Sequence, residues 1–356
     1  MIGQDGRGAG QARGVVHGRP GTATTVSDQA PDGPVVIGLS AAIVAVTDDE
    51  PRVLVVRDDG PDALPAGPFR PDAHRTLDIG LRAWVTAQTR LPLGYVEQLY
   101  TFADRGRDPR EWQGGPRIVS IGYLALVREA MPPADTAAAW RCWYDFFPWE
   151  DRRAGAAPVV AELIRPRLAA WIAAAAIPER NRRRARVDHA FGPEDDAHWH
   201  EDLVLERYEL LYEAGLVAEA ERDRSLSAAA AAGGGEMTAD GDLVPALGRP
   251  MRFDHRRILA TAIGRIRGKL GYRPLVFEVM PPAFTLTGLQ TAVEALAGRR
   301  LHKQNFRRLV AQAGLVEATG RMTHETGGRP AELYSFRAEV MQERGGAGLR
   351  LPGRRG

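Results

Sequence analysis

The sequence predicts an α/β domain with a mixed sheet, then a helical segment, and a C-terminal helix–turn–helix domain with a β-hairpin. Three observations predict this fold class. Apolar runs of strand length flank one amphipathic run of helical length between residues 34 and 150. Longer amphipathic runs follow up to residue 222. The pattern ends with a capped helix, a basic helix and two strand-like runs. The length of 356 residues fits two domains with tails.

Composition sets the expected boundaries. Residues 1–33 and 341–356 have little apolar content, so they cannot offset the entropy of ordering and are predicted to be disordered. The stretch SLSAAAAAGGGEMTADGD predicts a flexible linker. We therefore expect the α/β domain over 34–150, a helical intermediate region over 151–222, the linker over 223–246 and the C-terminal domain over 247–340.

The first domain is expected to run strand, strand, loop, helix and then further strands. Turn residues over 48–51 separate the first two strands, and Leu77, Leu81, Trp84 and Val85 repeat on one side of the helix over Thr76–Gln88. A polar loop, ADRGRDPREWQGGP, separates the later strands. The predicted strands are 35–46, 52–57, 96–102 and 117–127, with a loop over 64–71.

An aromatic cluster closes this domain in the stretch WYDFFPWEDRR. Such clusters are more often core than ligand platform. The rings expected to pack against the sheet are those of Trp143, Phe146, Phe147 and Trp149.

The intermediate region is expected to be helical. A helix over 158–173 should be kinked or interrupted at Pro166, which lacks the backbone donor of a regular turn. One long amphipathic helix is expected over HWHEDLVLERYELLYEAGLVAEAERD. Such helices can pack on either domain or against a second chain.

The C-terminal domain is predicted from a short helix and a basic helix. Thr285 can N-cap the first, TLTGLQTAVEALAG, which ends at Gly298. LVEATGRMTHE and AELYSFR are predicted strands with a Gly-containing tip between them, which complete a winged helix–turn–helix. In the basic helix LHKQNFRRLVAQAGLV, the residues at the spacing of one buried face are Phe306, Leu309, Val310 and Ala313.

The outward face of the basic helix carries cations and amides. Lysine and arginine can bind phosphates, Gln, Asn and Arg can hydrogen-bond base edges in a major groove, and an arginine at the hairpin tip can enter a minor groove. Taken alone, such a helix is more often a solvated charged face. The predicted DNA-binding residues are Arg300, Lys303, Gln304, Asn305, Arg307, Arg308 and Arg329.

The net charge is only +2, but cations crowd into the last third of the chain. We expect a local basic surface there, as phosphate binding requires. The cations concerned are Arg252, Arg256, Arg257, Arg265, Arg267, Lys269, Arg273, Arg299, Arg300, Lys303, Arg307 and Arg308.

Cysteine usage and hydropathy indicate the compartment. The single Cys142 excludes an internal disulfide and fits a reducing environment. No apolar run approaches the length of a membrane span. We expect a soluble cytoplasmic protein without a membrane partner.

Two parts of the chain resemble one known family. The run from MRFDHRR through KQNFRR to GGRPAELYSF, over about 251–337, closely resembles the C-terminal domain of the Nudix-related transcriptional regulators of NAD metabolism. LPAGPFRPD resembles the loop that leads into a Nudix box, and QLYTF, RDPR and RIVSIGY resemble the second half of the same regulators' Nudix domain. The intermediate region resembles, more weakly, an alphaproteobacterial subgroup of NAD regulators. The resemblance implies a Nudix-like effector domain followed by a winged helix.

The resemblance does not extend to the catalytic glutamates. Nudix hydrolases hold Mg²⁺ with carboxylates on their signature helix. Aligning TAQTRL with the family's REETGL places Trp84, Ala87 and Gln88 at the glutamate positions, and Asp72 and Asp78 are the only acids nearby in the sequence. We therefore predict no catalytic residue, no metal site and no cofactor.

A nucleotide diphosphate can still bind to such a domain without being cut. Arginine can form paired bonds with phosphates, and Asp can accept hydrogen bonds from ribose hydroxyls. The predicted ligand-binding residues are Arg57, Gln98, Arg107, Asp108, Arg110, Arg117 and Tyr123. Equally, Arg107-Asp108-Pro109-Arg110 fits a turn held by its own ion pairs, and Tyr123 fits a core residue.

Two other motifs carry less weight. His198, His200 and Glu201 are too close in sequence to share a helix face, and the chain has no CxxC or HExxH, so no zinc site is predicted. The run Gly233–Glu236 lacks the Lys and the Ser or Thr of a phosphate loop and is better explained as linker.

These observations predict a transcriptional regulator, a repressor, of NAD-metabolism genes. As the resemblance implies, its inactive Nudix-like domain would sense ADP-ribose, NAD or a related adenine nucleotide. It would bind a palindromic DNA operator as a homodimer, because two linked copies gain specificity and avidity. Two alternatives stay open: a divergent pyrophosphatase that uses Asp72 or Asp78, and a module whose winged helix binds another protein.

Overall fold

The computed structural model describes residues 34–57, 59–112, 114–193, 199–232, 247–271, 274–324 and 330–337. The predicted tails over 1–33 and 341–356, and the side chains of Arg273 and Arg329, lie outside these residues. Within them, no helix has the length and apolarity needed to cross a lipid bilayer.

The first domain contains the predicted mixed sheet, in the order β4-β5-β1-β2-β6 with β3 beside β1. β1 pairs parallel with β5, and the other pairs are antiparallel. Two short strands, β3 and β6, were not predicted, and β3 lies within the predicted loop over 64–71. The strands are β1 Val35–Thr47, β2 Glu50–Val56, β3 Ala66–Pro68, β4 Tyr95–Phe102, β5 Arg117–Leu126 and β6 Ala138–Cys142.

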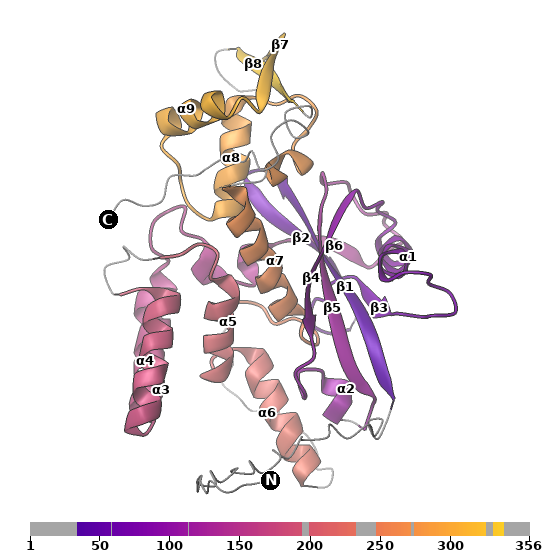
Figure 1. Cartoon of the computed structure of the whole chain (residues 1–356), viewed down its shortest axis with the longest axis vertical. Helices are drawn as coiled ribbons and strands as arrows, with labels where there is room; N and C mark the ends of the chain where they lie inside the picture. The colour runs from indigo at the N-terminus through magenta and orange to yellow at the C-terminus, as the bar shows by residue number, and fades with distance from the viewer. Residues whose placement is uncertain are drawn as a thin grey trace, which may run out of the picture. The chain divides into compact units, whose positions relative to one another are not determined.

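Alternate residues of β1 enter two different cores, as the period of a strand requires. Leu39 and Ala41 pack with α1 (Leu77–Thr89), while Ala42 and Val44 join a larger core on the opposite face. Figure 1 shows α1 on one side of the sheet and α7 (His255–Leu270) on the other. The predicted helix is confirmed, with Thr76 capping α1 by accepting the backbone N–H of Ile79 at 3.2 Å.

The predicted aromatic cluster is part of the larger core. The indole and phenyl rings of Trp143, Phe146, Phe147 and Trp149 are fully buried. They pack with residues of the sheet and also with α5 and α7, so this core is wider than the predicted contact with the sheet. The short helical turns here are α2 Pro109–Trp112 and the 3-10 turns Trp143–Asp145 and Pro148–Glu150.

The predicted helix over 158–173 is confirmed in its bounds. It contains a π-helical turn over Val160–Ile164 before α3 (Arg165–Ala173), which has Pro166 in its first turn, where a missing donor costs little. The rest of the intermediate region differs from prediction in two places. The arginine-rich run forms a helix, α4 (Ile177–Phe191), that was not predicted. The predicted long helix breaks at Gly215, whose φ of 72° ends a helix.

That break creates α5 (Val204–Glu213) and α6 (Ala218–Ala231). The predicted linker over 223–246 is therefore wrong for its first part, because α6 continues through residue 231. The Ala-rich sequence there favours a helix, and the buried side chain of Leu226 packs α6 against the rest of the protein.

The C-terminal domain is the predicted winged helix. Thr285 caps α8 (Leu286–Ala297) by accepting the backbone N–H of Gly288 at 3.0 Å, and Gly298 ends it with a φ of 74°. Phe306 and Val310 of α9 (Lys303–Ala313) are buried as predicted, and Leu309 and Ala313 are half-buried. The wing strands are β7 Val316–Thr323 and β8 Ala331–Phe336, and a 3-10 turn spans Leu275–Glu278.

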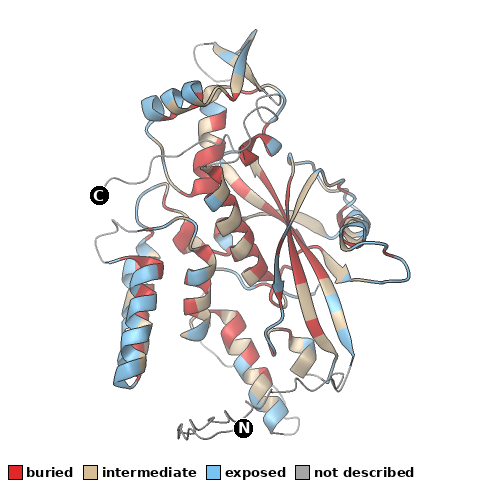
Figure 2. Ribbon diagram, viewed as in Figure 1, coloured by how far each residue is buried: buried red, intermediate tan, exposed pale blue. Residues whose placement is uncertain are grey.

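The two predicted domains share one core. α7 lies between the sheet and α5, and its apolar face continues into α8 and α9 (Figure 1). Figure 2 shows α7 and α8 mostly buried, whereas α9 presents an exposed outer face. Helix α7 therefore connects the sheet mechanically to the helix–turn–helix.

Candidate nucleic-acid interface and nucleotide cradle

The outer face of α9 is cationic and accessible. Its apolar residues Phe306 and Val310 fix the helix on the core, and the helix contains no acidic residue. The Arg308 guanidinium donates a long hydrogen bond of 3.4 Å to the Asn305 side-chain oxygen. All the predicted DNA-binding residues that the structure describes are exposed: Arg300, Lys303, Gln304, Asn305, Arg307 and Arg308.

Arg300 is bound to a carboxylate. It precedes α9 and its Nη1 lies 2.7 Å from the Glu294 carboxylate, although 60% of its side chain is exposed. The same carboxylate accepts the backbone N–H of Leu301 at 2.9 Å, so Glu294 orders the turn that leads into α9.

The wing is attached to the core by its aromatic residues. The rings of Phe277 and Phe336 stack with centroids 4.2 Å apart, and the backbones of Phe284 and Tyr334 form a single antiparallel β-bridge. The predicted contact Arg329 lies outside the described residues. Sequence reasoning missed Arg321, which is exposed on β7, although its place in a predicted wing strand was a usable signal.

The predicted basic surface of the last third does not form as a whole. Arg256 is fully buried and bound to Glu219, and Arg267 is bound to Glu150. Their positive charges are neutralised inside the protein, since carboxylates from distant segments reach them. Arg257, Arg265 and Lys269 are likewise ion-paired, with Glu209 or Glu97 among their partners.

The helix α1 carries the residues that align with the Nudix glutamates. The Gln88 amide donates to the carbonyl of Ala66 at 2.8 Å and accepts its N–H at 3.0 Å. The Trp84 ring covers Gly67 so closely that a Cβ there would lie 2.2 Å from it. These residues thus hold β3 against α1. Among the described residues, no group of three or more His, Cys, Asp or Glu is arranged to hold a metal ion.

The predicted ligand residues around α2 are held by ion pairs. Asp108 accepts the backbone N–H of Arg110 at 3.0 Å and also binds its guanidinium, so this segment is a turn held by its own pair. Arg117 lies 2.8 Å from Glu111. Arg107 binds Glu209 of α5 at 2.6 Å and covers the Tyr212 ring at 3.6 Å.

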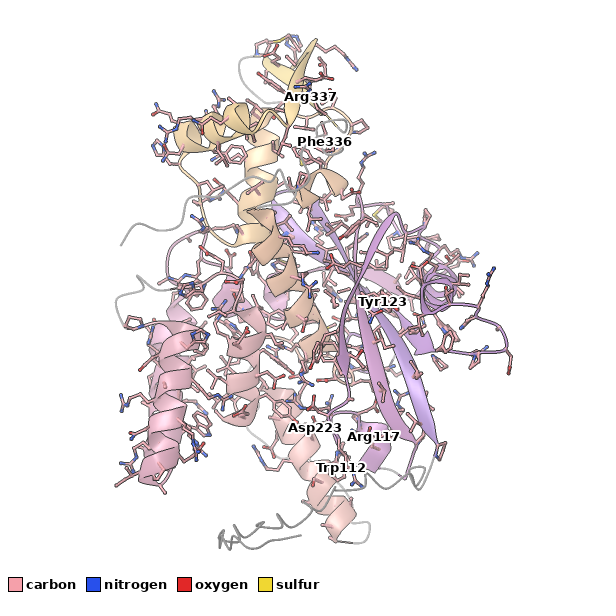
Figure 3. All side chains as sticks on the ribbon, viewed as in Figure 1. Trp112, Arg117, Tyr123, Asp223, Phe336 and Arg337 are labelled. Atoms are coloured by element: carbon pink, nitrogen blue, oxygen red, sulfur yellow. The ribbon has the colours of Figure 1, made fainter. Side chains whose placement is uncertain are left out.

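The remaining ligand candidates lie elsewhere on the domain. Gln98 and Tyr123 are cross-strand partners, with Gln98 exposed and Tyr123 buried in the α1-side core. Burial, with a contribution from Asp78, raises the pKa of Tyr123. Arg57 lies 3.7 Å from Asp62. Figure 3 shows Tyr123 midway along the sheet and Arg117 near its lower end, so these two predicted residues do not lie together.

The start of α7 contacts the loops of the sheet domain. The Nδ1 atom of His255 accepts the backbone N–H of Leu64 at 3.0 Å, and the Arg110 guanidinium lies 4.5 Å from the Phe253 ring. Arg107 Nη1 lies 3.8 Å from the Asp254 carboxylate. Sequence reasoning did not single out Asp254 or His255, because only the fold brings them to these loops.

Burial shifts the pKa values of both groups. It raises the pKa of Asp254 to about 7, against the opposing effect of Arg257 and Arg107. It lowers the pKa of His255 to about 3. His255 is therefore neutral, with its proton on Nε2, because Nδ1 accepts the bond from Leu64.

The fold and these surfaces define a class: a Nudix-like mixed-sheet domain joined to a winged helix through a shared core. Residues 276–336 match the family model of the NrtR DNA-binding winged helix domain. This match lies within the C-terminal domain and covers its α8, α9 and wing.

Two known proteins are similar to this chain, one over part of its sequence and one in its fold. An ADPR responsive transcriptional repressor from Acinetobacter baylyi is 42% identical over 94 residues, which cover 26% of this chain and 37% of that protein. The matched part is thus little more than a third of that relative. NrtR from Shewanella oneidensis, in a crystal structure with a 27mer DNA, has the same fold, with a TM-score of 0.51 at 18% identity over 89% of this chain and 99% of that one.

Proposed function

We propose that this protein is a transcriptional repressor of NAD-metabolism genes whose winged helix binds an operator. The observation that carries the proposal is the acid-free outer face of α9, with Lys303, Gln304, Arg307 and Arg308 exposed over a buried apolar face. Cations there suit phosphates, and the amides and guanidinia suit base edges in a major groove. Arg321 and Arg329 of the wing would contact phosphates or the minor groove. The curated relative's description as a repressor supports the same function.

The operator would be palindromic and the protein a homodimer. A single α9 can read only a few base pairs, and two symmetric copies about one helical turn of DNA apart would multiply both specificity and affinity. A cytoplasmic setting follows from this role.

The effector would be an NAD-derived nucleotide, ADP-ribose or NAD, bound by the Nudix-like domain. The relative's description as ADPR responsive supports ADP-ribose. Arg107 and Arg110 would offer cations to its phosphates. The domain would not hydrolyse the nucleotide, because Trp84, Ala87 and Gln88 cannot ligate Mg²⁺ as glutamates do.

Contacts at the start of α7 would transmit effector binding. Arg107 and Arg110 contact Asp254 and Phe253, which lead directly into α7. A phosphate that attracts Arg107 would compete with Glu209 and Asp254 for its charge, and α7 carries any shift to α8. A coupling of about 1–3 kcal/mol would change DNA affinity about 5- to 150-fold.

A gel-shift experiment tests the DNA-binding part. The double variant Arg307→Ala/Arg308→Ala should lose most affinity for DNA from upstream of its own gene. The control is Arg182→Ala/Arg186→Ala on α4, which removes the same charge from another exposed helix. Equal binding by both variants would favour a protein-interaction module instead.

An incubation with ADP-ribose and Mg²⁺ or Mn²⁺ separates a sensor from an enzyme. A sensor should bind ADP-ribose, change the affinity for DNA and leave the nucleotide intact. Turnover that disappears on changing Asp72 or Asp78 would instead establish the divergent pyrophosphatase.

A further inference from the structure

A pocket of about 300 Å³ lies where three distant segments meet. One segment follows the sheet domain, one leads into α5, and the third is the turn between α8 and α9. The residues that line it are Arg152, Arg153, Gly155, Trp199, Glu201, Gly298, Arg299 and Arg300. None of them is among the predicted ligand-binding residues.

Arginines dominate this lining. Four arginines line it, and Glu201 is the one acidic residue among the lining residues. Arg152 is only 8% exposed, and its guanidinium carbon lies 4.1 Å from the centre of the Trp199 ring. Arg207 lies 4.0 Å from the same ring, so Trp199 is held between the core and the pocket.

Carboxylates hold the arginines in place from around the pocket. Arg299 lies 2.7 Å from Glu201, and Arg300 lies 2.7 Å from Glu294. Arg153 is bound to Asp151 at 2.8 Å. A guanidinium has five N–H donors, and one carboxylate accepts at most two of them in its plane. A guanidinium bound to one carboxylate, such as that of Arg300, can therefore also bind an oxygen of a second anion.

The pocket is also next to the DNA-binding helix. The turn Gly298–Arg300 lines it, and the backbone carbonyl of Gly298 accepts the backbone N–H of Arg152 at 2.8 Å. The same turn leads into α9, which starts at Lys303. An anion held here would contact both the end of the sheet domain and the residues that orient α9.

We propose that this pocket binds a phosphate-bearing anion, with Arg152, Arg299 and Arg300 as its ligands. Guanidinium groups match the geometry of phosphate oxygens, and several of them in one pocket can bind different oxygens of a group such as a diphosphate. The anion is either a free small molecule or a backbone phosphate of DNA bound at α9. This site is additional to the proposed effector cradle and does not depend on it.

Calorimetric titration of the full chain with inorganic pyrophosphate tests the site. Arg299→Gln should weaken binding about tenfold, the loss of one charge-assisted bond. Glu201→Gln should strengthen it several-fold, because Glu201 competes with the anion for Arg299. The matched control is Arg186→Gln on α4, whose guanidinium pairs with Glu213 outside the pocket and which should leave affinity unchanged. Thermal unfolding confirms that each variant is folded.

DNA binding by the same variants identifies the source of the phosphate. If DNA supplies it, Arg299→Gln lowers DNA affinity and reduces the slope of log affinity against log salt by about one. If a free anion supplies it, DNA affinity without pyrophosphate stays unchanged in this variant. If neither Arg299→Gln nor Glu201→Gln changes the affinity for pyrophosphate, the proposal is overturned, whether or not α9 binds DNA.

Discussion

Helices α7 and α9 both carry cations, yet these cations lie in opposite environments. Arg256 and Arg267 of α7 are buried and neutralised by Glu219 and Glu150. On α9, Arg307 and Arg308 are exposed on a helix without acids. The difference arises because other segments surround α7, so that Glu219 of α6 and Glu150 of the turn Pro148–Glu150 reach its arginines, whereas only one face of α9 meets the core. A basic helix therefore acquires a structural or a binding role from its neighbours.

The largest expected loss of stability follows from removing the charge of the buried Glu150 carboxylate. Glu150→Gln leaves Arg207 and Arg267 without their carboxylate in the core, and removing one partner of a buried ion pair costs about 3–5 kcal/mol. Chemical denaturation of the full chain measures the free energy of unfolding. Glu213→Gln, in an exposed pair with Arg186, is the control and should change it by less than about 1 kcal/mol. Equal losses would show that the α7 cations are not structural.

The next effect appears as a pH dependence at the start of α7. The pKa of His255 is lowered to about 3 in the folded protein. The neutral imidazole therefore stabilises the fold fully above pH 6.5, and this stability is lost as pH falls towards 3. Each pH unit costs about 1.4 kcal/mol, so about 3 kcal/mol is lost by pH 4.

Comparison with His255→Asn isolates this contribution. The asparagine stays neutral at every pH, so the stability difference between the two proteins should shift in favour of the variant as pH falls. The exposed His189→Asn serves as a control. A pH-independent difference between wild type and His255→Asn would contradict the assignment.

A smaller effect is expected at the half-exposed end of α7. Glu97 binds Arg265 and Lys269 from β4. Burial raises the pKa of Glu97, but hydrogen bonds from Lys269 and Tyr95 outweigh it, so the pKa is lowered overall. The pair thus stabilises the fold above pH 4.5 and loses this contribution in acid. Glu97→Gln should cost about 1 kcal/mol near neutral pH and less at pH 3, measured by denaturation. If Glu97→Gln lowers the free energy of unfolding as much as Glu150→Gln does, the contribution of these ion pairs does not depend on their burial.

The same contrast explains what the sequence could predict. Local signals identified Thr76 and Thr285 as caps and Phe306 as the inner side of α9, because a cap or a helical period depends on nearby residues only. The partners of Arg256 and Arg267 come from distant segments, so the predicted basic surface was largely wrong. Arg107 and Arg110 lie in the predicted loop, but only the fold showed that they contact Glu209 and Phe253.

The smallest effect on stability should accompany a large effect on DNA binding. Arg307→Ala removes an exposed cation from α9, and a surface change of this kind alters the free energy of unfolding by less than about 0.5 kcal/mol. If Arg307 contacts a phosphate, the slope of log affinity against log salt falls by about one, with affinity weakened on all sequences alike. If it contacts a base, the loss of affinity is confined to the operator and the slope stays unchanged.

The control is Arg182→Ala, which changes a side chain that is 73% exposed on α4. This variant should be as stable as Arg307→Ala and should retain both the DNA affinity and the slope. Destabilisation by Arg307→Ala comparable to Glu97→Gln would remove the distinction between α7 and α9, because α9 would then use its cations for folding as α7 does.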